Sequence, residues 1–434
     1  MSSPNNLIIN KSKPLIGNLK IPGDKSISHR SIILGALSNG ELTISNFLTS
    51  DDCNATINAM RELGADITIN DNQVYIKGKG LFSLKQPKKI IDAGNSGTLI
   101  RLLAGVLAVQ DFDSTITGDD SLKKRPMGRI IKPLISCGAK IEANEHKAPL
   151  SIYGSTSLTP IEYYQDVASA QVKSCLILSA LHISGQSTFH EEIETRDHTE
   201  NLLEHLSYKI NRESKFLSLE GKQKLIAKDI FIGSDISSAA FFIVACLIVD
   251  GSCVEMRNVN INKFRTGIVT VLKGMGADIE ITEIKKVSNE LIGNIKVRHS
   301  KLKCAEIKGE IIPSLIDELP ILFIACASAS GTSKISGIEE LRYKESDRIM
   351  AMEDGLRAIG INVHSSKDSI EITGGKITGG KVDSYDDHRI AMSFAIAGLI
   401  SEQSLTIMDT QNISTSFPTF VTILRELGVE IFEI

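Results

Sequence analysis

The chain has 434 residues, of which 42% are hydrophobic, and a formal net charge of −4 at pH 7. These values are typical of a globular protein, and the length exceeds what one core usually supports, so we expect two domains. A nucleic-acid-binding protein would be more basic. The polar start, Met1–Asn6, lacks the features of a signal peptide, and no uninterrupted apolar run reaches membrane-spanning length. We therefore expect neither nucleic acid nor a membrane as a partner.

The seven cysteines are scattered along the chain, and Cys175, Cys246 and Cys326 lie inside apolar runs. The sequence has no Cys-x-x-Cys pair, which indicates reduced, buried thiols and a cytoplasmic location. It has no His-x-x-x-His pair and no Gly-x-Gly-x-x-Gly turn between a strand and a helix. We therefore expect no metal site and no dinucleotide cofactor.

In chain order, six short polar clusters each stand immediately before an apolar run of helical length. They begin at Gly23, Gly94, Ala168, Gly233, Leu315 and Tyr385. A helix start leaves backbone N–H groups unpaired and carries partial positive charge, so each cluster is a candidate anion site. Several also contain Lys or Arg, which suggests a ligand with phosphate or carboxylate groups. We assign no ligand to the fourth cluster, at Gly233, and expect Ser234 or Asp235 to cap its helix.

After each apolar run the sequence predicts a strand, a second helix and a final short strand. The second helix ends at a glycine in five copies, namely Gly64, Gly138, Gly276, Gly360 and Gly428. Glycine ends a helix in the left-handed conformation at low steric cost. The exits recur at intervals of about 70 residues, which indicates a repeated unit. Ser207 takes the place of glycine in the third copy, which is therefore the least typical.

Six units divide naturally into two domains of three. We expect one domain over residues 22–232 and a second made of residues 1–21 plus 233–434. The boundaries fall near Pro22, which ends an alternating stretch, and near Gly233, between the third and fourth units. The strand-like stretch over residues 7–19 would then complete the second domain, leaving two chain crossings as a hinge.

The first cluster places Lys25, Ser26 and Arg30 at a helix start, with Ser26 and Arg30 on one face. A solvated first turn is the simple interpretation, but cations are disfavoured there by the helix dipole, which favours an anion site. In the second cluster Gly97 would let backbone N–H groups approach a ligand, unless it is only a turn glycine.

The basic run that contains Arg125 could be a solvated surface. Arg125 precedes a proline, which holds it extended and could aim it into a cleft. Taken alone, Lys344 and Arg348 predict an exposed helix with ion pairs. Asp317 and Glu318 enter an apolar run, where burial would raise a carboxylate pKa towards acid–base use.

The sixth cluster, Asp386-Asp387-His388-Arg389, places four titratable groups at one helix start. His388 is either a capping or core histidine or a functional group. Together with Pro22–Arg30, Gly94–Gly105, Arg125-Pro126-Met127 and Lys344–Arg348, this cluster resembles the signatures of the 5-enolpyruvylshikimate-3-phosphate synthase family. The resemblance runs through all six units in the expected order.

The resemblance implies a two-domain inside-out α/β barrel fold, each domain with three βαβαββ repeats and the active site in the interdomain cleft. It implies transfer of the enolpyruvyl group of phosphoenolpyruvate to the 5-hydroxyl of shikimate 3-phosphate, through a tetrahedral intermediate, with release of phosphate. It also implies that no metal or organic cofactor takes part, and we expect a monomer.

The resemblance also carries site residues over by position. Those matched to shikimate 3-phosphate binding are Lys25, Ser26, Arg30, Ser169, Gln171, Asp317 and Lys344. Those matched to phosphoenolpyruvate binding are Lys25, Gly97, Arg125, Gln171, Arg348 and Arg389. Asp317 would accept the hydroxyl proton and Glu345 would protonate the methylene carbon, with Lys25 and His388 in support. Further candidates are Asn95, Thr98, Ala170, Thr195 and Arg196.

Three positions depart from the pattern of some members. Ala170 replaces a serine, Glu340 an asparagine, and Thr415 a lysine that binds phosphoenolpyruvate. A carboxylate contact is therefore missing or supplied by another residue.

Two other functions remain open at this stage. The sister enzyme that acts on UDP-N-acetylglucosamine uses a cysteine on a basic loop, and the loop over residues 123–129 has none. A non-catalytic anion-binding homologue would lack the acid–base pair, but Asp317 and Glu345 are both present.

Overall fold

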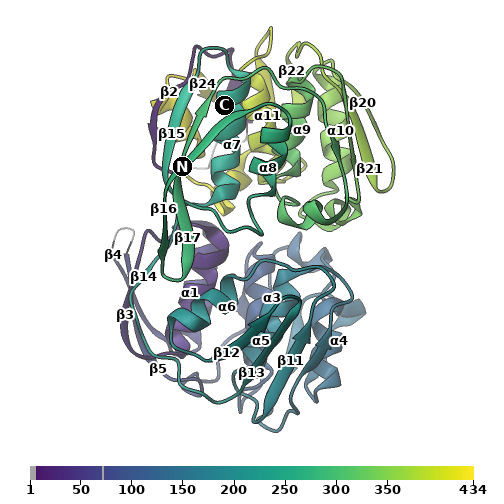
Figure 1. Cartoon of the computed structure of the whole chain (residues 1–434). Coiled ribbons are helices and arrows are strands. Elements are labelled where there is room, and N and C mark those ends of the chain that lie inside the picture. The colour runs from purple at the N-terminus through teal and green to yellow at the C-terminus, as the bar shows by residue number, and fades with distance from the viewer. Residues whose placement is uncertain (1–5, 71–72) are drawn as a thin grey trace. The chain divides into compact units, whose positions relative to one another are not determined.

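The computed structural model describes residues 6–70 and 73–434, which form a mixed α/β protein of two compact units (Figure 1). The 23–232 unit consists of Gly23–Ile232 and Lys286–Glu290. Of the described residues, the 233–434 unit contains 6–22, 233–285 and 291–434. The sequence-based division placed residues 286–290 in the other domain. They group with the 23–232 unit because Ser288 accepts from the Phe231 amide at 2.9 Å and Glu290 contacts His198 at 2.8 Å.

The 23–232 unit contains three repeats, each with an inner and an outer helix. The inner helices are α1 (Lys25–Leu37), α3 (Gly97–Leu107) and α5 (Ala170–Ala180), and the outer ones are α2 (Asp51–Glu62), α4 (Gly128–Ser136) and α6 (His198–His205). The strands are β3 (Asn39–Ser45), β4 (Asp66–Asn70), β5 (Gln73–Lys79), β6 (Ile91–Asp92), β7 (Ser114–Thr117), β8 (Lys140–Glu142), β9 (Leu150–Tyr153), β10 (Glu162–Tyr164), β11 (Gln186–His190), β12 (Ile210–Glu213), β13 (Phe216–Glu220) and β14 (Ile230–Phe231).

The 233–434 unit has the same plan. Its inner helices are α7 (Ile236–Ile248), α9 (Leu319–Ser328) and α11 (His388–Gly398), and its outer ones are α8 (Gly267–Gly274), α10 (Arg348–Ala358) and α12 (Phe420–Glu426). Its strands are β1 (Asn6–Ile9), β2 (Ile16–Leu19), β15 (Cys253–Asn260), β16 (Asp278–Val287), β17 (Glu290–Arg298), β18 (Glu306–Ile307), β19 (Thr332–Ser336), β20 (Asn362–Ser365), β21 (Ser369–Thr373), β22 (Gly380–Asp383), β23 (Leu405–Met408) and β24 (Ile431–Glu433).

Over the described residues the strands form six four-stranded sheets, one for each repeat. The order β6-β7-β9-β8 is representative: the first pair is parallel and the other two pairs are antiparallel. Three sheets are completed by strands distant in sequence. β14 joins β3, β2 joins β15, and β1 lies between β23 and β24. The chain therefore closes each unit on itself.

Each unit has one hydrophobic core, built around its three inner helices. In α7 every residue except Ile248 is buried, which explains why this helix is apolar on all sides. The strands instead alternate, as in β5, where every second residue is buried. Helices inside and sheets outside are the inside-out α/β arrangement that the family resemblance implied. In Figure 1, α7, α9 and α11 lie among the strands of their unit.

The six polar clusters are helix starts, as predicted. Five of the inner helices carry a side-chain cap, from Asp24, Ser96, Ser169, Asp235 and Asp387. Each of these side chains accepts a hydrogen bond from a backbone N–H of the first turn, which would otherwise be unpaired. The sixth inner helix, α9, follows Glu318, whose side chain makes no such bond.

The helix exits share one backbone conformation. The five exit glycines have φ between 82° and 103°, and Ser207 has φ 64°. The third repeat therefore keeps the left-handed exit although it lacks the glycine. A non-glycine residue in this conformation costs about 1–2 kcal/mol.

Replacing Ser207 by glycine is therefore expected to stabilise the protein, by up to about 1 kcal/mol, because glycine removes the strain but loses more chain entropy on folding. The reverse change, Gly428→Ser, is the matched control. It should destabilise through backbone strain alone, because Gly428 has φ 82° and a Cβ added there would meet nothing within 4 Å. Chemical denaturation measures both. A less stable Ser207→Gly variant would contradict the strain argument.

Candidate active site

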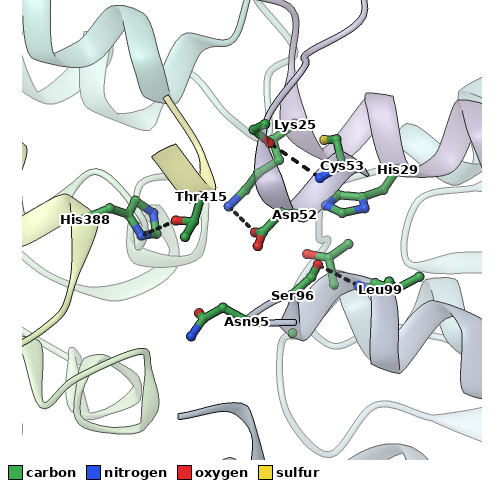
Figure 2. A network of polar contacts seen from close by, with 12 residues as sticks. Lys25, His29, Asp52, Cys53, Asn95, Ser96, Leu99, His388 and Thr415 are labelled. Atoms are coloured by element: carbon green, nitrogen blue, oxygen red, sulfur yellow. Dashed lines mark hydrogen bonds and ion pairs between the residues drawn. The ribbon is translucent and has the colours of Figure 1, made fainter. Parts of the chain in front are cut away.

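In the 23–232 unit, Lys25 is the first residue of α1, and its Nζ lies 3.0 Å from Oδ2 of Asp52 (Figure 2). The two side chains are 18% and 10% exposed. Asp52 stands in the first turn of α2, where a carboxylate is favoured. The aspartate thus offsets a cation that the α1 dipole disfavours, and Lys25 stays partly open to solvent.

Arg30 is buried, and its guanidinium is fixed from three directions. Nε donates to Thr199 Oγ1 and Nη2 to Ser174 Oγ, both at 2.8 Å, and Nη1 donates to the Ser26 carbonyl at 2.9 Å. Thr199 in turn donates to Ser174 at 2.8 Å. These three acceptors hold the guanidinium in place, and arginine stays protonated in proteins. The group is therefore a fixed positive charge of the kind that suits an anion.

Arg125 is the most constrained residue of the basic loop. Its backbone is extended, with φ −74° and ψ 138°, as the following proline predicts, and the residue is 7% exposed. Its Nη2 donates to Oδ1 of Asn95 at 2.7 Å, and Asn95 donates to Asp119 at 2.7 Å. Arg125 is therefore buried, whereas Lys123, Lys124 and Arg129 of the same run are exposed, as expected for a solvated surface.

Gly97 begins α3 between two guanidinium groups. A Cβ placed on Gly97 would lie 2.8 Å from Nη1 of Arg101 and 2.9 Å from Nη1 of Arg125. Arg101 donates to the Gly97 carbonyl and to Oε1 of Gln171, and Gln171 donates to Thr98 at 3.0 Å. At the start of α3, the side chains of Arg101, Arg125 and Gln171 therefore lie close to the Gly97 backbone, which carries no side chain of its own.

The third cluster places Ser169 at the N-cap of α5 and Ala170 at its first position, and the Ser169 side chain accepts from the Val172 amide. Thr195 is buried at 5% exposure and Arg196 is partly buried, in the segment that leads to α6. Ser169, Thr195 and Arg196 are therefore ordered by elements of the third repeat.

In the 233–434 unit, Asp317 lies just before α9 and is surrounded by cations. Lys344 Nζ lies 3.2 Å from Oδ1 of Asp317, and Nη1 of Arg348 lies 3.9 Å from the same atom. Arg389 donates to the backbone carbonyl of Asp317 at 2.8 Å. The carboxylate is 18% exposed, so it can reach a ligand.

Arg348 is 1% exposed, so the exposed ion-paired helix that the sequence suggested is wrong here. Lys344 instead follows a 3₁₀ turn, η4 (Glu339–Tyr343), and Arg348 begins α10. Arg348 donates to Asp387 at 2.7 Å and to Glu345 at 2.6 Å. The turn between Lys344 and α10 thus presents Glu345 beside the same arginine that approaches Asp317.

The Arg348–Asp387 pair is fully buried, and its charges perturb both groups. Burial alone would lower the pKa of Arg348, but the carboxylates of Asp387 and Glu345 raise it above its ordinary value. Burial alone would raise the pKa of Asp387, but Arg348 holds it below its ordinary value. Both groups therefore stay charged, and the pair forms a fixed support for Glu345.

Of the two carboxylates at the start of α9, Glu318 is the buried one, at 0% exposure. It accepts a short hydrogen bond from Ser237, which also accepts from Arg265 at 2.7 Å. The sequence predicted burial for both Asp317 and Glu318. Glu318 is the one that is fully buried, and Asp317 is still partly exposed to solvent.

His388 is the first residue of α11 and is 4% exposed. Its Nδ1 lies 3.5 Å from the hydroxyl of Thr415 (Figure 2). Some relatives are expected to carry a lysine at the position of Thr415. In this chain the threonine at that position contacts His388 instead. Asp386 accepts from Asn412 at 3.0 Å, which ties the same segment to the turn before Thr415.

Sequence reasoning missed the groups that fix these side chains. Asp52, Ser174 and Thr199 come from other elements than the cations they contact, and no spacing in the sequence connects them. Asp387 was recognised only as part of a polar cluster. Its signal was an aspartate at a helix start, which predicts a cap, and it does accept from the Arg389 amide at 2.8 Å.

Within the described residues, one group of side chains has metal-ligand geometry, formed by Asp197, His198 and Glu290. Its atoms are already engaged, because His198 contacts Glu290 at 2.8 Å and Asp197 pairs with Arg212. The adjacent guanidinium disfavours a second cation. No helix in the described part of the chain is long and apolar enough to cross a membrane.

The geometry defines a class of protein. The 23–232 unit gathers guanidinium, ammonium and backbone donors at helix starts, and the 233–434 unit places two partly exposed carboxylates among cations. Such sets suit a transferase that binds small substrates with phosphate and carboxylate groups and moves protons between them.

The particular family follows from comparison with known proteins. The family model described as EPSP synthase (3-phosphoshikimate 1-carboxyvinyltransferase) matches residues 9–424. The chain is 45% identical to the 3-phosphoshikimate 1-carboxyvinyltransferase of a Coxiella burnetii strain over 422 residues, covering 97% of this chain and 96% of the relative. It is 47% identical to that of Legionella pneumophila over 426 residues, covering 97% and 98%.

A solved structure of EPSP synthase from Acinetobacter baumannii superposes with a TM-score of 0.88 at 42% identity, covering 98% of this chain and 99% of that one. The chain therefore belongs to the EPSP synthase family. This family transfers the enolpyruvyl group of phosphoenolpyruvate to shikimate 3-phosphate in the pathway to aromatic amino acids. The alternative of the UDP-N-acetylglucosamine enzyme is thereby set aside.

Proposed function

We propose that this chain catalyses the reaction of its family with the residues of the two clusters described above. The observation that carries the proposal is the arrangement of Asp317 and Glu345. Both are partly exposed, and both are held by Arg348, at 3.9 Å and 2.6 Å. A proton acceptor and a proton donor held by one buried cation fit a reaction that needs both.

In the addition step, Asp317 accepts the proton of the substrate 5-hydroxyl, and the hydroxyl oxygen forms a bond to C2 of phosphoenolpyruvate. Glu345 delivers a proton to the methylene carbon, which becomes a methyl group in the tetrahedral intermediate. In the elimination step Glu345, left as a carboxylate by the addition, takes a proton back from that methyl group while the C2–O bond to phosphate breaks, which restores the double bond. The departing phosphate takes the proton that Asp317 had accepted. Lys25 and His388 are further charged or polar groups that assist the proton transfers of Asp317 and Glu345.

Binding of shikimate 3-phosphate is assigned to Lys25, Ser26, Arg30, Ser169 and Gln171 of the 23–232 unit, with Asp317 and Lys344. The fixed guanidinium of Arg30 supports this assignment, because planar Arg groups suit phosphate. Further contacts are proposed for Ala170, Thr195 and Arg196.

Phosphoenolpyruvate is assigned to a set rich in arginine, namely Lys25, Gly97, Arg125, Gln171, Arg348 and Arg389. The convergence of Arg101 and Arg125 on Gly97 supports this set, with Asn95 and Thr98 as neighbours. Thr415 offers no charge, so Arg348 and Arg389 would supply the carboxylate contact that some relatives take from a lysine.

The activity test uses the purified protein with shikimate 3-phosphate and phosphoenolpyruvate. We expect stoichiometric release of phosphate and formation of the enolpyruvyl ether. UDP-N-acetylglucosamine in place of shikimate 3-phosphate should give no release. Turnover of the UDP-sugar with none of shikimate 3-phosphate would sink the proposal.

Gly97→Ala is expected to raise KM for phosphoenolpyruvate by about tenfold, because its Cβ would push against both arginine side chains. KM for shikimate 3-phosphate should change much less. Gly274→Ala is the control, since a Cβ at that helical glycine meets nothing within 4 Å. Initial-rate kinetics decide the matter: equal KM values for wild type and Gly97→Ala would remove Gly97 from the ligand site.

We also infer a cytoplasmic location and a monomeric state. All seven cysteines are free, which favours a reducing compartment. Cell fractionation tests the location. Light scattering of the purified protein tests the oligomeric state, and a mass of about twice 47.2 kDa would contradict the monomer.

A further inference from the structure

A buried lysine in the 23–232 unit has no part in the function proposed so far. Lys173 lies in α5 with a side chain that is 3% exposed. Its Nζ lies 2.9 Å from Oε2 of Glu191 and 2.8 Å from Oε1 of Glu200. These carboxylates are 11% and 4% exposed. Removing three charges from water is costly, so such a cluster is weak evidence for stability alone.

The first carboxylate of this cluster shapes the segment that carries Thr195 and Arg196. Glu191 follows β11, and its Oε1 accepts from the Thr195 amide at 3.1 Å and from the Thr195 hydroxyl at 2.6 Å. The other oxygen of the same carboxylate is the one that pairs with Lys173. Lys173 therefore fixes the carboxylate around which residues 191–195 fold.

The second carboxylate connects Lys173 to the residues that hold Arg30. Glu200 is in the first turn of α6, next to Thr199, and Ser174 follows Lys173 on α5. Thr199 and Ser174 are the two hydroxyl groups that receive the Arg30 guanidinium. The ion pair between Lys173 and Glu200 thus joins α5 to α6 at the place where Arg30 is held.

We propose that Lys173 is a positioning residue for shikimate 3-phosphate, holding the 191–197 segment and α6 so that Thr195, Arg196 and Arg30 meet the phosphorylated substrate. This inference rests on the proposed function. Lys173 acts through its partners, because its ammonium pairs with both Glu191 and Glu200. Burial alone would lower its pKa, but Glu200 and Glu191 raise it above the ordinary value, so it serves as a fixed cation and not as a base.

Two variants separate positioning from general stability. Lys173→Met removes the cation and leaves two buried carboxylates facing each other. Glu191→Gln keeps the size of the side chain, but its amide has one oxygen only, so it cannot accept from Thr195 on one side and from Lys173 on the other. Lys228→Met, at an exposed lysine of the same unit, is the matched control.

Steady-state kinetics, thermal unfolding and calorimetric titration with shikimate 3-phosphate alone are measured for each variant. We expect KM and Kd for shikimate 3-phosphate to rise by about ten- to a hundredfold in Glu191→Gln and at least as much in Lys173→Met. KM for phosphoenolpyruvate should change by less than about threefold, and Lys228→Met should match the wild type.

Unchanged KM for shikimate 3-phosphate in a folded Glu191→Gln protein would overturn the inference, and so would equal rises in both KM values. Failure of both variants to fold would also overturn it, because the cluster would then be needed for the fold itself. A wild-type protein that turns over neither substrate would instead contradict the proposed function. The two failures are therefore distinguishable.

Discussion

Asp317→Asn and Glu345→Gln are each expected to lower kcat by about a hundred- to ten-thousand-fold, the usual contribution of one acid–base group. Neither amide can take or supply the proton that the reaction moves. Both variants should fold normally. In Asp317→Asn the new amide keeps an oxygen for Lys344, and the bond from Arg389 goes to the backbone carbonyl, which the substitution leaves in place.

The matched control is Glu340→Gln, an amide change at a neighbouring carboxylate that is given no proton-transfer role; it should retain most of kcat. Single-turnover measurements with both substrates separate chemistry from binding. Near-normal kcat in Asp317→Asn would remove Asp317 from the role of base, and the same result in Glu345→Gln would remove that residue from the role of acid. Circular dichroism and the unfolding midpoint establish that the variants are folded.

Asp387→Ala is expected to lower the free energy of unfolding by about 3–5 kcal/mol, because it leaves the buried Arg348 with one of its two carboxylate partners removed. The change also deletes the cap of α11, which adds about 1 kcal/mol. Urea denaturation monitored by circular dichroism measures the loss. Asp278→Asn, which disrupts an exposed pair with Arg298, is the control and should change the stability by less than about 0.5 kcal/mol.

A double-mutant cycle identifies the pair as the cause. Arg348→Met combined with Asp387→Ala should cost less than the sum of the two single changes, by about 0.5–3 kcal/mol. Additive losses would mean that the two side chains do not stabilise each other. The difference between wild type and Asp387→Ala should persist above pH of about 3.9, the ordinary Asp value. It should shrink as the pH falls through the lower pKa of the folded protein, where Asp387 becomes protonated.

The helix starts and exits are features that local sequence predicts well. Asp235 caps α7 as predicted, and Asp24 and Ser96 cap their helices in the same way, because a cap depends on a side chain and an amide only two or three residues away. The left-handed exits follow from glycine for the same local reason. Ser207 was the exception, and it adopts the same left-handed conformation without the favourable residue.

The candidate site was recognisable as a set of residues but not as an arrangement. Matching motifs named Lys25, Arg125, Asp317 and Arg348, since those motifs are long and occur in order. Their partners escaped notice because they lie far away in sequence, as Arg30 and Thr199 do at a separation of 169 residues. The helix predicted around Lys344 failed for a related reason: Asp387 holds Arg348 inside the protein, and periodicity carries no information about that contact.

The sequence by itself determined the repeated unit, the capped helix starts, the left-handed exits and the family, because each depends on short-range chemistry or on the order of motifs. The tertiary structure alone decided that β1 enters the sheet of the last repeat and that residues 286–290 join the 23–232 unit. It also decided that Lys173 is buried between Glu191 and Glu200. These features depend on which distant segments pack together. Burial then sets how strongly the charged groups in those segments interact with one another.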